Sequence, residues 1–359
     1  MKEFLKRKNI EISVKRYGID ALGAMAQGLF ASLLIGTILN TLGGQLGIAF
    51  LTTAGGYAAS CSGAAMAAAI GYALQAPPLV LFSLVTVGYA ANALGSTTLS
   101  GGSGAGGPLA VLFIAIIAAE CGKAVSKETK VDILVTPIVT VLVGVGLSAW
   151  WAPAIGTAAS AVGGVIRWAT VQQPFLMGIV VSVVIGMALT LPISSAAICA
   201  ALGLTGLAGG AAVAGCCAQM VGFAFMSLKE NKWGGLISQG IGTSMLQMGN
   251  IVRNPWIWLP PTLTAAITGP IATCLFRLEM NDPASAVASG MGTCGLVGQI
   301  GVYAGWAADV ASGAKAAVTP FDWAGLVLIS LVLPALLTPL IAVPFRRAGL
   351  IKDGDMTLS

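Results

Sequence analysis

The chain offers hydroxyl, amide and backbone groups for chemistry, and it contains no histidine. Without an imidazole no side chain titrates near neutral pH in the ordinary way, and catalytic triads and zinc–histidine sites are excluded. The seven cysteines form no CxxC pair and mostly lie in apolar segments, which is typical of small buried hydrophobic residues. We therefore expect no enzyme, no catalytic residue, no metal and no cofactor.

Small polar residues are concentrated in segments that interrupt apolar runs. The clearest are TLPISS at 190–195, SQGIGTSMLQMGN at 238–250 and NDPASAVASGMGTCGLVGQIGVY at 281–303. Transporters use broken helices to present backbone N–H and C=O groups to a solute inside the membrane. The candidate solute-binding residues are Thr190, Pro192, Ser194, Ser195, Gln247, Asn250, Ser289, Gly290, Gly292, Thr293, Cys294, Gly295 and Gln299.

Segment 281–303 also admits a second interpretation. Its small residues are compatible with tight helix–helix packing followed by an ordinary external loop. A further stretch, the glycine-rich GGSGAGG at 101–107, lacks the lysine of a phosphate-binding loop and is flanked by apolar segments. Nucleotide binding is therefore not expected there.

The composition excludes an ordinary water-soluble protein. Of the 359 residues, 57% are hydrophobic and only 9% are charged, and the mean hydropathy is +0.90. Soluble domains are about 25% charged, so the lipid bilayer must surround most of this chain. The net charge is +5, but the basic residues are not spread over a face, and no nucleic acid partner is expected.

Apolar runs of about 20 residues, the length that spans a bilayer, recur along the chain. The clear candidates are residues 20–41, 77–94, 108–126, 133–151, 174–193, 257–276 and 323–345. Less uniform candidates are residues 55–75, 208–228 and 296–308. We expect an all-α polytopic membrane protein with roughly eight to ten membrane elements.

The basic residues predict the orientation. Six of the 18 lysines and arginines lie in the first sixteen residues, which places the N-terminus in the cytoplasm. Arg346, Arg347 and Lys352 follow the last span and place the C-terminus on the same side.

A moderately amphipathic stretch suggests how the chain is organised. Residues 152–172, with Arg167 beside Trp168, fit either a helix along the membrane interface or a poor span. Taken as a linker, this stretch divides the chain into a basic N-terminus (1–19), a first membrane domain (20–151), a second membrane domain (173–345) and a C-terminal tail (346–359).

Three blocks carry a family resemblance: SGMGTCGLVGQIGVY, ALTLPISSAAICAALGLTGLAGGAA and GNIVRNPWIWLPPTLTAAITGPI. They resemble the EIIC-like membrane proteins of the phosphotransferase system, and more narrowly the branch that includes the PfoR-type regulators of perfringolysin expression. The resemblance covers nearly the whole chain. It implies a homodimer in the bacterial inner membrane, with an interface domain followed by a transport domain. It also implies two re-entrant hairpins, around 190–210 and 281–300, and an elevator motion.

The chain departs from the sugar-carrying members of that family. Those proteins hold the sugar with a glutamate in a hairpin motif and often with a histidine, whereas this hairpin reads TLPISS. No EIIA or EIIB domain is expected in the chain. We expect a transporter of a small neutral or anionic solute that is not coupled to phosphorylation. Two alternatives remain open: a membrane sensor that binds a solute in the same cavity, and a sugar permease subunit IIC served by separate EIIA and EIIB subunits.

Overall fold

The structure is a computed structural model in which helices account for nearly all regular structure. It describes residues 2–101, 104–161, 166, 168–170, 172–281 and 285–358. Within these ranges no strand forms, apart from one isolated bridge between Gly206 and Met280. Six helices are long and apolar enough to cross a membrane: Lys15–Gly44, Pro78–Gly95, Gly107–Val125, Asp132–Ser160, Gly206–Met226 and Pro320–Arg347. The predicted all-α polytopic class is confirmed.

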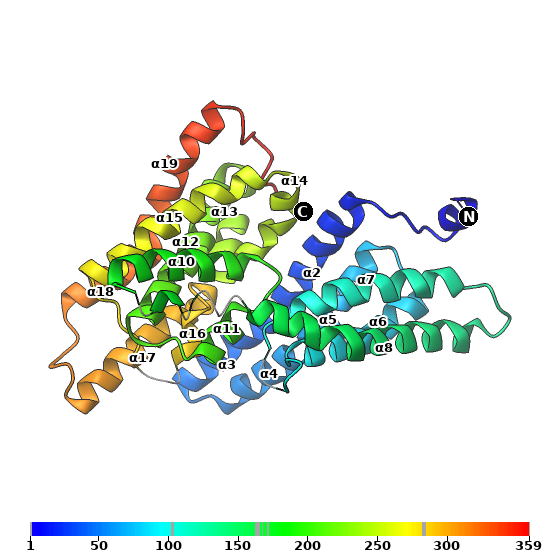
Figure 1. The fold of residues 1–359 in the computed structure, drawn as a ribbon, viewed down its shortest axis with the longest axis horizontal. Coiled ribbons are helices and arrows are strands. Elements are labelled where there is room, and N and C mark those ends of the chain that lie inside the picture. Colours follow the sequence, from blue (N-terminus) through cyan, green and yellow to red (C-terminus); the bar gives the residue numbers. More distant parts are fainter. Residues whose placement is uncertain are drawn as a thin grey trace. The chain divides into compact units, whose positions relative to one another are not determined.

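The chain divides into two compact units, Met1–Ser160 and Ala161–Ser359, which are described separately (Figure 1). The first unit begins with α1 (Lys2–Arg7) and a long helix with two π-helical stretches. This helix comprises η1 (Lys15–Asp20), α2 (Ala21–Leu29), η2 (Phe30–Leu34) and α3 (Ile35–Leu46). It ends at Gly47, whose φ of 68° suits a glycine C-cap.

The remaining helices of the first unit pack through small residues. They are α4 (Ala49–Ser60), α5 (Ser62–Ala73), α6 (Pro78–Gly95), α7 (Gly107–Val125) and α8 (Asp132–Ser160). A Cβ added to Gly63 would lie 2.3 Å from the carbonyl oxygen of Gly88, so α5 and α6 approach closely only because both residues are glycines. Helix α8 does not end at residue 151, and the start of the predicted linker therefore lies inside it. Arg167 of that linker lies outside the described residues.

In the second unit, α10 (Pro174–Thr190) and α12 (Gly206–Met226) run side by side in the same direction. A Cβ on Gly215 would lie 1.9 Å from the carbonyl oxygen of Ser182, and further along Thr190 hydrogen bonds to Gln219. Because neighbouring parallel helices need a return connection, residues 191–205 run back along them. This return contains α11 (Ser195–Leu202), and α10 together with the return to Gly206 is the first excursion.

The chain after α12 makes a second excursion. It passes through α13 (Leu228–Ile237) and η3 (Ser238–Gly242), breaks at Thr243, and continues as η4 (Ser244–Gln247) and α14 (Met248–Arg253). Thr243 is fully extended, with φ −160° and ψ 144°. The segment starts beside Ser227, to which Gln239 donates a 2.9 Å bond, and its break reaches Thr190.

Helix α15 (Leu259–Pro270), flanked by η5 (Pro255–Trp258) and η6 (Ile271–Leu275), runs antiparallel to α10. The hydroxyl of Ser182 donates to the carbonyl of Ala265 at 2.7 Å, and Thr273 donates to Pro174 at 2.8 Å. The chain then reaches Met280, which lies beside the start of α12.

A third excursion follows, of which residues 282–284 lie outside the described part. It contains α16 (Ala286–Ser289), a turn at 290–293, η8 (Cys294–Leu296) and α17 (Val297–Ser312). Its turn packs against Cys216 at the middle of α12, and Gly305 of α17 returns to the backbone of Met280.

The last span is continuous through α18 (Pro320–Val327), η9 (Leu328–Val332) and α19 (Leu333–Arg347). A capping box between Thr319 and Asp322 starts it. Thr338 packs against Gly222 of α12 and lies 2.9 Å from the Thr264 hydroxyl of α15. Helix α12 is thus surrounded by its own unit, with 89% of its apolar window buried.

Candidate functional site

Three chain breaks of the second unit meet beside the middle of α12. They lie at residues 190–195, 243–244 and 290–296. Together with Gln219 of α12 they form what we call the break cluster. The breaks at 190–195 and 290–296 belong to the first and third excursions, which start near Gly206. The break at 243–244 belongs to the second excursion, which starts near Ser227.

The first break results from Pro192. The residue before a proline avoids the helical region, and Leu191 accordingly has ψ 158°, which ends α10 at Thr190. Ser194 then starts α11, because its hydroxyl accepts a 3.2 Å bond from the amide of Ala197. The first-turn amides of Ser195 and Ala196 have no acceptor within the helix.

The first and second breaks are joined by hydroxyl groups. Thr190 Oγ1 lies 2.8 Å from Ser244 Oγ and donates to Gln219 Oε1 at 3.3 Å. All three side chains are fully buried. Such buried polar groups persist only when they are paired, so these contacts fix the relative position of the two breaks.

Gln219 is a residue that the sequence prediction missed. Its Oε1 also accepts a 3.1 Å bond from the indole of Trp258, and its Nε2 donates to Thr262 at 3.1 Å. It is the only long polar side chain in the Gly206–Met226 helix, and that isolation in an apolar run was the available signal.

The third break requires glycine. Gly292 and Gly295 have φ of 54° and 53°, in the left-handed region. A Cβ on Gly292 would lie 2.6 Å from Cys216 Cβ, and one on Gly290 would lie 2.7 Å from the carbonyl carbon of Ser195. The Ser195 hydroxyl donates to the Gly290 carbonyl at 2.7 Å, so the structure brings these two predicted residues together.

The other predicted residues of the third break face α12 or their own helix. Thr293 Oγ1 lies 3.6 Å from Met220 Sδ, and Ser289 donates to Ala286 within α16. Cys294 is buried. Gln299 Nε2 lies 3.3 Å from Cys217 Sγ, whereas its buried Oε1 has no hydrogen-bond partner among the described residues. An orphaned buried acceptor calls for a donor such as water or a solute.

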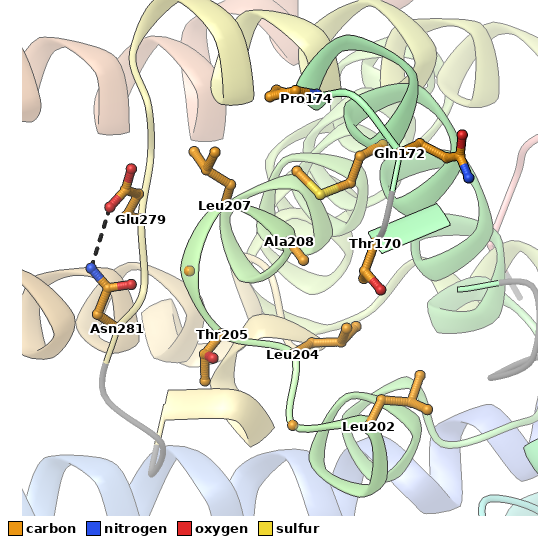
Figure 2. Close-up of a pocket in the computed structure, with 13 residues that line it drawn as sticks. Thr170, Gln172, Pro174, Leu202, Leu204, Thr205, Leu207, Ala208, Glu279 and Asn281 are labelled. Atoms are coloured by element: carbon orange, nitrogen blue, oxygen red, sulfur yellow. Dashed lines mark hydrogen bonds between the residues drawn. The ribbon is translucent and has the colours of Figure 1, made fainter. Parts of the chain in front are cut away.

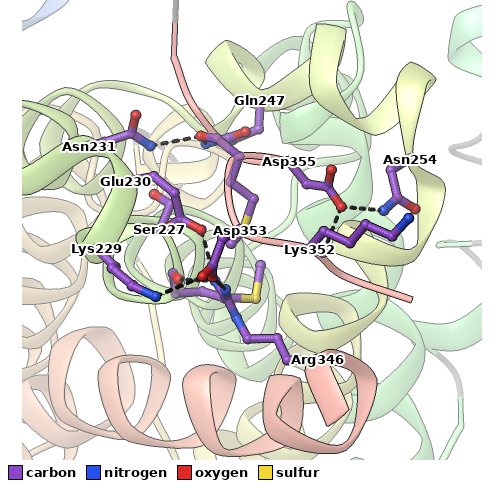
Figure 3. Close-up of polar contacts among 12 residues, drawn as sticks. Ser227, Lys229, Glu230, Asn231, Gln247, Asn254, Arg346, Lys352, Asp353 and Asp355 are labelled. Atoms are coloured by element: carbon purple, nitrogen blue, oxygen red, sulfur yellow. Dashed lines mark hydrogen bonds and ion pairs between the residues drawn. The ribbon is translucent and has the colours of Figure 1, made fainter. Parts of the chain in front are cut away.

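Two predicted residues hold the C-terminal tail instead of facing the other breaks. Gln247, labelled in Figure 3, donates through Nε2 to the carbonyl of Met356 at 2.9 Å. Asn250 Nδ2 donates to the carbonyl of Thr357 at 3.0 Å. Gln247 also bonds to Gln239 at 2.8 Å. These amides are therefore occupied by protein groups.

Ion pairs fasten the same tail. Asp353 accepts from Lys229 at 2.8 Å and from Arg346 at 3.0 Å, and Arg346 also pairs with Glu230 at 3.1 Å (Figure 3). The Lys229 ammonium, with Arg346 beyond it, holds the pKa of Asp353 below its usual value. The tail is thereby tied to the excursion that contains the second break.

A pocket of about 560 Å³ lies where the first excursion starts and ends, opposite to its tip (Figure 2). It is lined where α11 ends and α12 begins, around Thr205, and by Gln172, Glu279 and Asn281. Asn281 Nδ2 lies 3.3 Å from Glu279 and 2.9 Å from Asp309. Its acidic and amide groups contrast with the break cluster, whose described residues include no carboxylate, ammonium or guanidinium.

The break cluster can bind through hydroxyl, amide and main-chain groups. Its N–H donors at the start of α11 carry the partial positive charge of a helix N-terminus, which favours neutral acceptors and anions. The arrangement offers no nucleophile–base pair and, among described residues, no group of metal ligands.

A comparison with protein families supports the membrane assignment. The family described as "Phosphotransferase system, EIIC" matches residues 19–358. No curated protein and no solved structure matches the chain. With its six candidate spans and a match over nearly its whole length, the chain is a multi-pass membrane protein that belongs to the phosphotransferase system EIIC family of permeases.

Proposed function

We propose that the protein carries a small neutral or anionic solute across the bacterial inner membrane without coupling to phosphorylation. The solute would bind at the break cluster, against the α11 N-terminus and the turn at 290–295. The contact between Ser195 and Gly290 carries this proposal, because it joins two interrupted segments inside the unit. Both termini would lie in the cytoplasm, as the basic residues indicate.

In this proposal the first and third excursions are re-entrant hairpins. The parallel course of α10 and α12 supports the hairpin of the first excursion, because residues 191–205 must run back between them. The contact of Gly305 with Met280 supports the hairpin of the third excursion, because the chain returns to where that excursion began. At 1.5 Å per residue, Gln219 lies about 20 Å along α12, so the hairpin tips reach deep into the bilayer. The segment 228–254 would enter from the opposite face and complete the site.

The second unit would then be the body that moves. Its three excursions are joined to one another and to α12 by buried bonds such as Thr190–Ser244, Ser195–Gly290 and Thr190–Gln219, so they would travel together as a rigid transport domain. The first unit would supply the contact between two protomers. This is the homodimeric elevator that the family resemblance implies.

The chemistry of the site restricts the solute. An organic cation would need a carboxylate partner, and none belongs to the break cluster. A sugar held by a glutamate and a histidine does not fit the same groups, which argues against phosphorylation-coupled sugar uptake. The family match nevertheless favours a second candidate, a sugar permease subunit IIC working with separate EIIA and EIIB.

The experiment begins with a thermal-shift screen of polyols, sugars and small carboxylates, because a ligand that binds the folded state raises its melting temperature. The compound that stabilises the protein is then followed, radiolabelled, into proteoliposomes. We expect uptake without phosphoenolpyruvate. Strict dependence on phosphoenolpyruvate and added EIIA and EIIB would instead establish the sugar permease.

A matched pair of serine variants tests the position of the site. Ser195→Ala is expected to weaken stabilisation by the compound and to reduce its uptake. Ser312→Ala removes an exposed hydroxyl at the end of α17 and is expected to leave both unchanged. Equal behaviour of the two variants would rule out the break cluster as the binding site.

A further inference from the structure

The first unit contains a basic pocket that the transport proposal does not use. Its volume is about 400 Å³, and it is lined where α1 folds back against the loop between α7 and α8. Four of its lining residues are basic, Arg7, Lys8, Lys123 and Lys127, and one is acidic, Glu128. The pocket lies just beyond the ends of three candidate spans, those that start at Lys15 and Pro78 and that end at Val125.

The ion pairs do not neutralise all of the positive charge in this pocket. Glu128 is shared between Arg7, at 2.7 Å, and Lys8, and these two cations hold its pKa below the usual value. Lys123 is 1% exposed and pairs with Glu120 at 2.9 Å. The Lys127 side chain makes no ion pair or hydrogen bond with any described residue, although the Asp132 carboxylate, which accepts from the Lys127 amide at 2.7 Å, offsets part of the positive charge. A pocket with this balance attracts an anion.

Two further features indicate that the pocket is a binding site. Ser126, which lines it, is only 4% exposed, and its hydroxyl has no hydrogen-bond partner among the described residues. Three residues of its wall, Asn9, Gln75 and Lys127, hold φ between 54° and 59°, where side chains are unfavourable. Backbone strain of this kind persists where contacts with the surrounding protein or with a ligand offset its energetic cost.

The surroundings indicate a lipid. Large apolar side chains within five residues of the pocket's lining along the chain are exposed: Ile12, Val14, Tyr72, Val131 and Ile133. In a bilayer they would offer contacts for acyl chains close in sequence to the basic groups. The positive-inside rule assigns this end to the cytoplasmic leaflet, in which anionic lipids are recognised by basic pockets between helices.

We propose that this pocket binds a phosphate group, and that its source is the headgroup of an anionic phospholipid. Arg7 and Lys127 contact the phosphate, and the Ser126 hydroxyl donates to one of its oxygens. Lys8 and Glu128 hold α1 in place as the outer wall. The lipid thus fastens the N-terminal helix of the first unit to the membrane surface.

Binding is measured on the full-length protein in detergent, by native mass spectrometry with phosphatidylglycerol or phosphatidylcholine added. We expect phosphatidylglycerol to be retained preferentially. Lys127→Gln should weaken its retention about fivefold, the factor for one cation near a membrane surface. Lys130→Gln, at another exposed lysine that does not line the pocket, should weaken it less than twofold.

Thermal shift with inorganic phosphate, against sodium chloride of equal ionic strength, separates the two sources of phosphate. A shift with phosphatidylglycerol but not with inorganic phosphate supports the lipid. A shift with inorganic phosphate alone, abolished by Lys127→Gln, would overturn the lipid assignment. Equal retention of the two lipids together with no phosphate-dependent shift, or equal loss in the Lys127 and Lys130 variants, would overturn the site itself.

Discussion

The hydroxyl of Ser195 donates a 2.7 Å hydrogen bond to the carbonyl of Gly290, across 95 residues of sequence. Both groups are buried, and they lie at the tips of two excursions that start from the same end of α12. The bond provides a donor for the Gly290 carbonyl, which lies in the turn at 290–293 and not in a helix. Any movement of one tip relative to the other must break it.

We expect Ser195→Ala to destabilise the protein by about 1–3 kcal/mol, the cost of leaving a buried acceptor unpaired. Thermal unfolding in detergent measures this loss. Ser195→Thr keeps the hydroxyl and should recover part of the stability. If Ser195→Ala unfolds at the temperature of the parent protein, the bond does not hold the two tips together.

Gly292 should tolerate no side chain. Its φ of 54° and the 2.6 Å distance from a built Cβ to Cys216 Cβ both disfavour alanine. The left-handed conformation alone costs about 1–2 kcal/mol for other residues. Gly292→Ala should therefore abolish uptake of the solute found in the screen while the protein still inserts into the membrane.

The control for this variant is Gly234→Ala, since a Cβ at Gly234 meets nothing within 4 Å. Uptake and membrane insertion should both match the parent protein. Normal uptake by Gly292→Ala would contradict a solute site at this turn. Loss of insertion in both variants would show that any added methyl group is harmful, whatever its position.

The sequence was sufficient for the fold class and for the first break. Apolar runs predicted the six candidate spans, although the runs at 174–193 and 257–276, also predicted to be clear spans, form the shorter helices α10 and α15. The segment TLPISS was predicted to interrupt an apolar run, and α10 ends there at Thr190 because Pro192 follows, which is a local effect. Residues 208–228 were expected to be a less uniform span, yet 206–226 is a complete helix buried by its own unit. Its glycines and alanines lower the hydropathy where helices pack closest, so the hydropathy pattern alone understates this span.

Long-range partners could not be read from the sequence. The break at Thr243 contains no proline, and its extended backbone depends on contacts with Thr190 and its neighbours. Gln247 was predicted to bind solute because it is polar in an apolar context. In the structure its amide donates to the carbonyl of Met356, 109 residues away, and no local pattern indicates that pairing.

Gln219 should be the residue whose loss most disturbs the break cluster. Gln219→Ala leaves Trp258 Nε1 and the Thr190 and Thr262 hydroxyls without this shared partner. Only Trp258 Nε1 then lacks a partner, because Thr190 keeps its contact with Ser244 and Thr262 still donates to the Trp258 carbonyl, so a fall of about 1–3 kcal/mol in unfolding free energy is expected. Denaturant or thermal unfolding in detergent measures it.

The matched control for Gln219 is Gln173→Ala, at an exposed residue just before α10 that makes no capping bond. It should change stability by less than about 0.5 kcal/mol, as surface substitutions usually do. Similar losses in both variants would mean that the Gln219 network contributes nothing beyond an ordinary surface glutamine.

The tail contact should loosen in acid. Lys229, followed by Arg346, holds the pKa of Asp353 below its usual value of 3.8. A carboxylate with a lowered folded-state pKa stabilises the folded state above its unfolded-state pKa, and that contribution is lost as pH falls through the folded-state value. The tail should therefore stay attached at neutral pH and detach only below about pH 4.

Hydrogen exchange at the amide of Leu358, which donates to Asn231 at 2.8 Å, reports this detachment. Asp353→Asn removes the charge, so its tail should exchange faster at pH 7 and lose the acid-dependent change. Glu3→Gln neutralises an exposed carboxylate of the first unit and should leave the exchange unaltered. If Asp353→Asn keeps the parent's protection at pH 7, the ion pairs do not fasten the tail, and the amides of Gln247 and Asn250 hold it unaided.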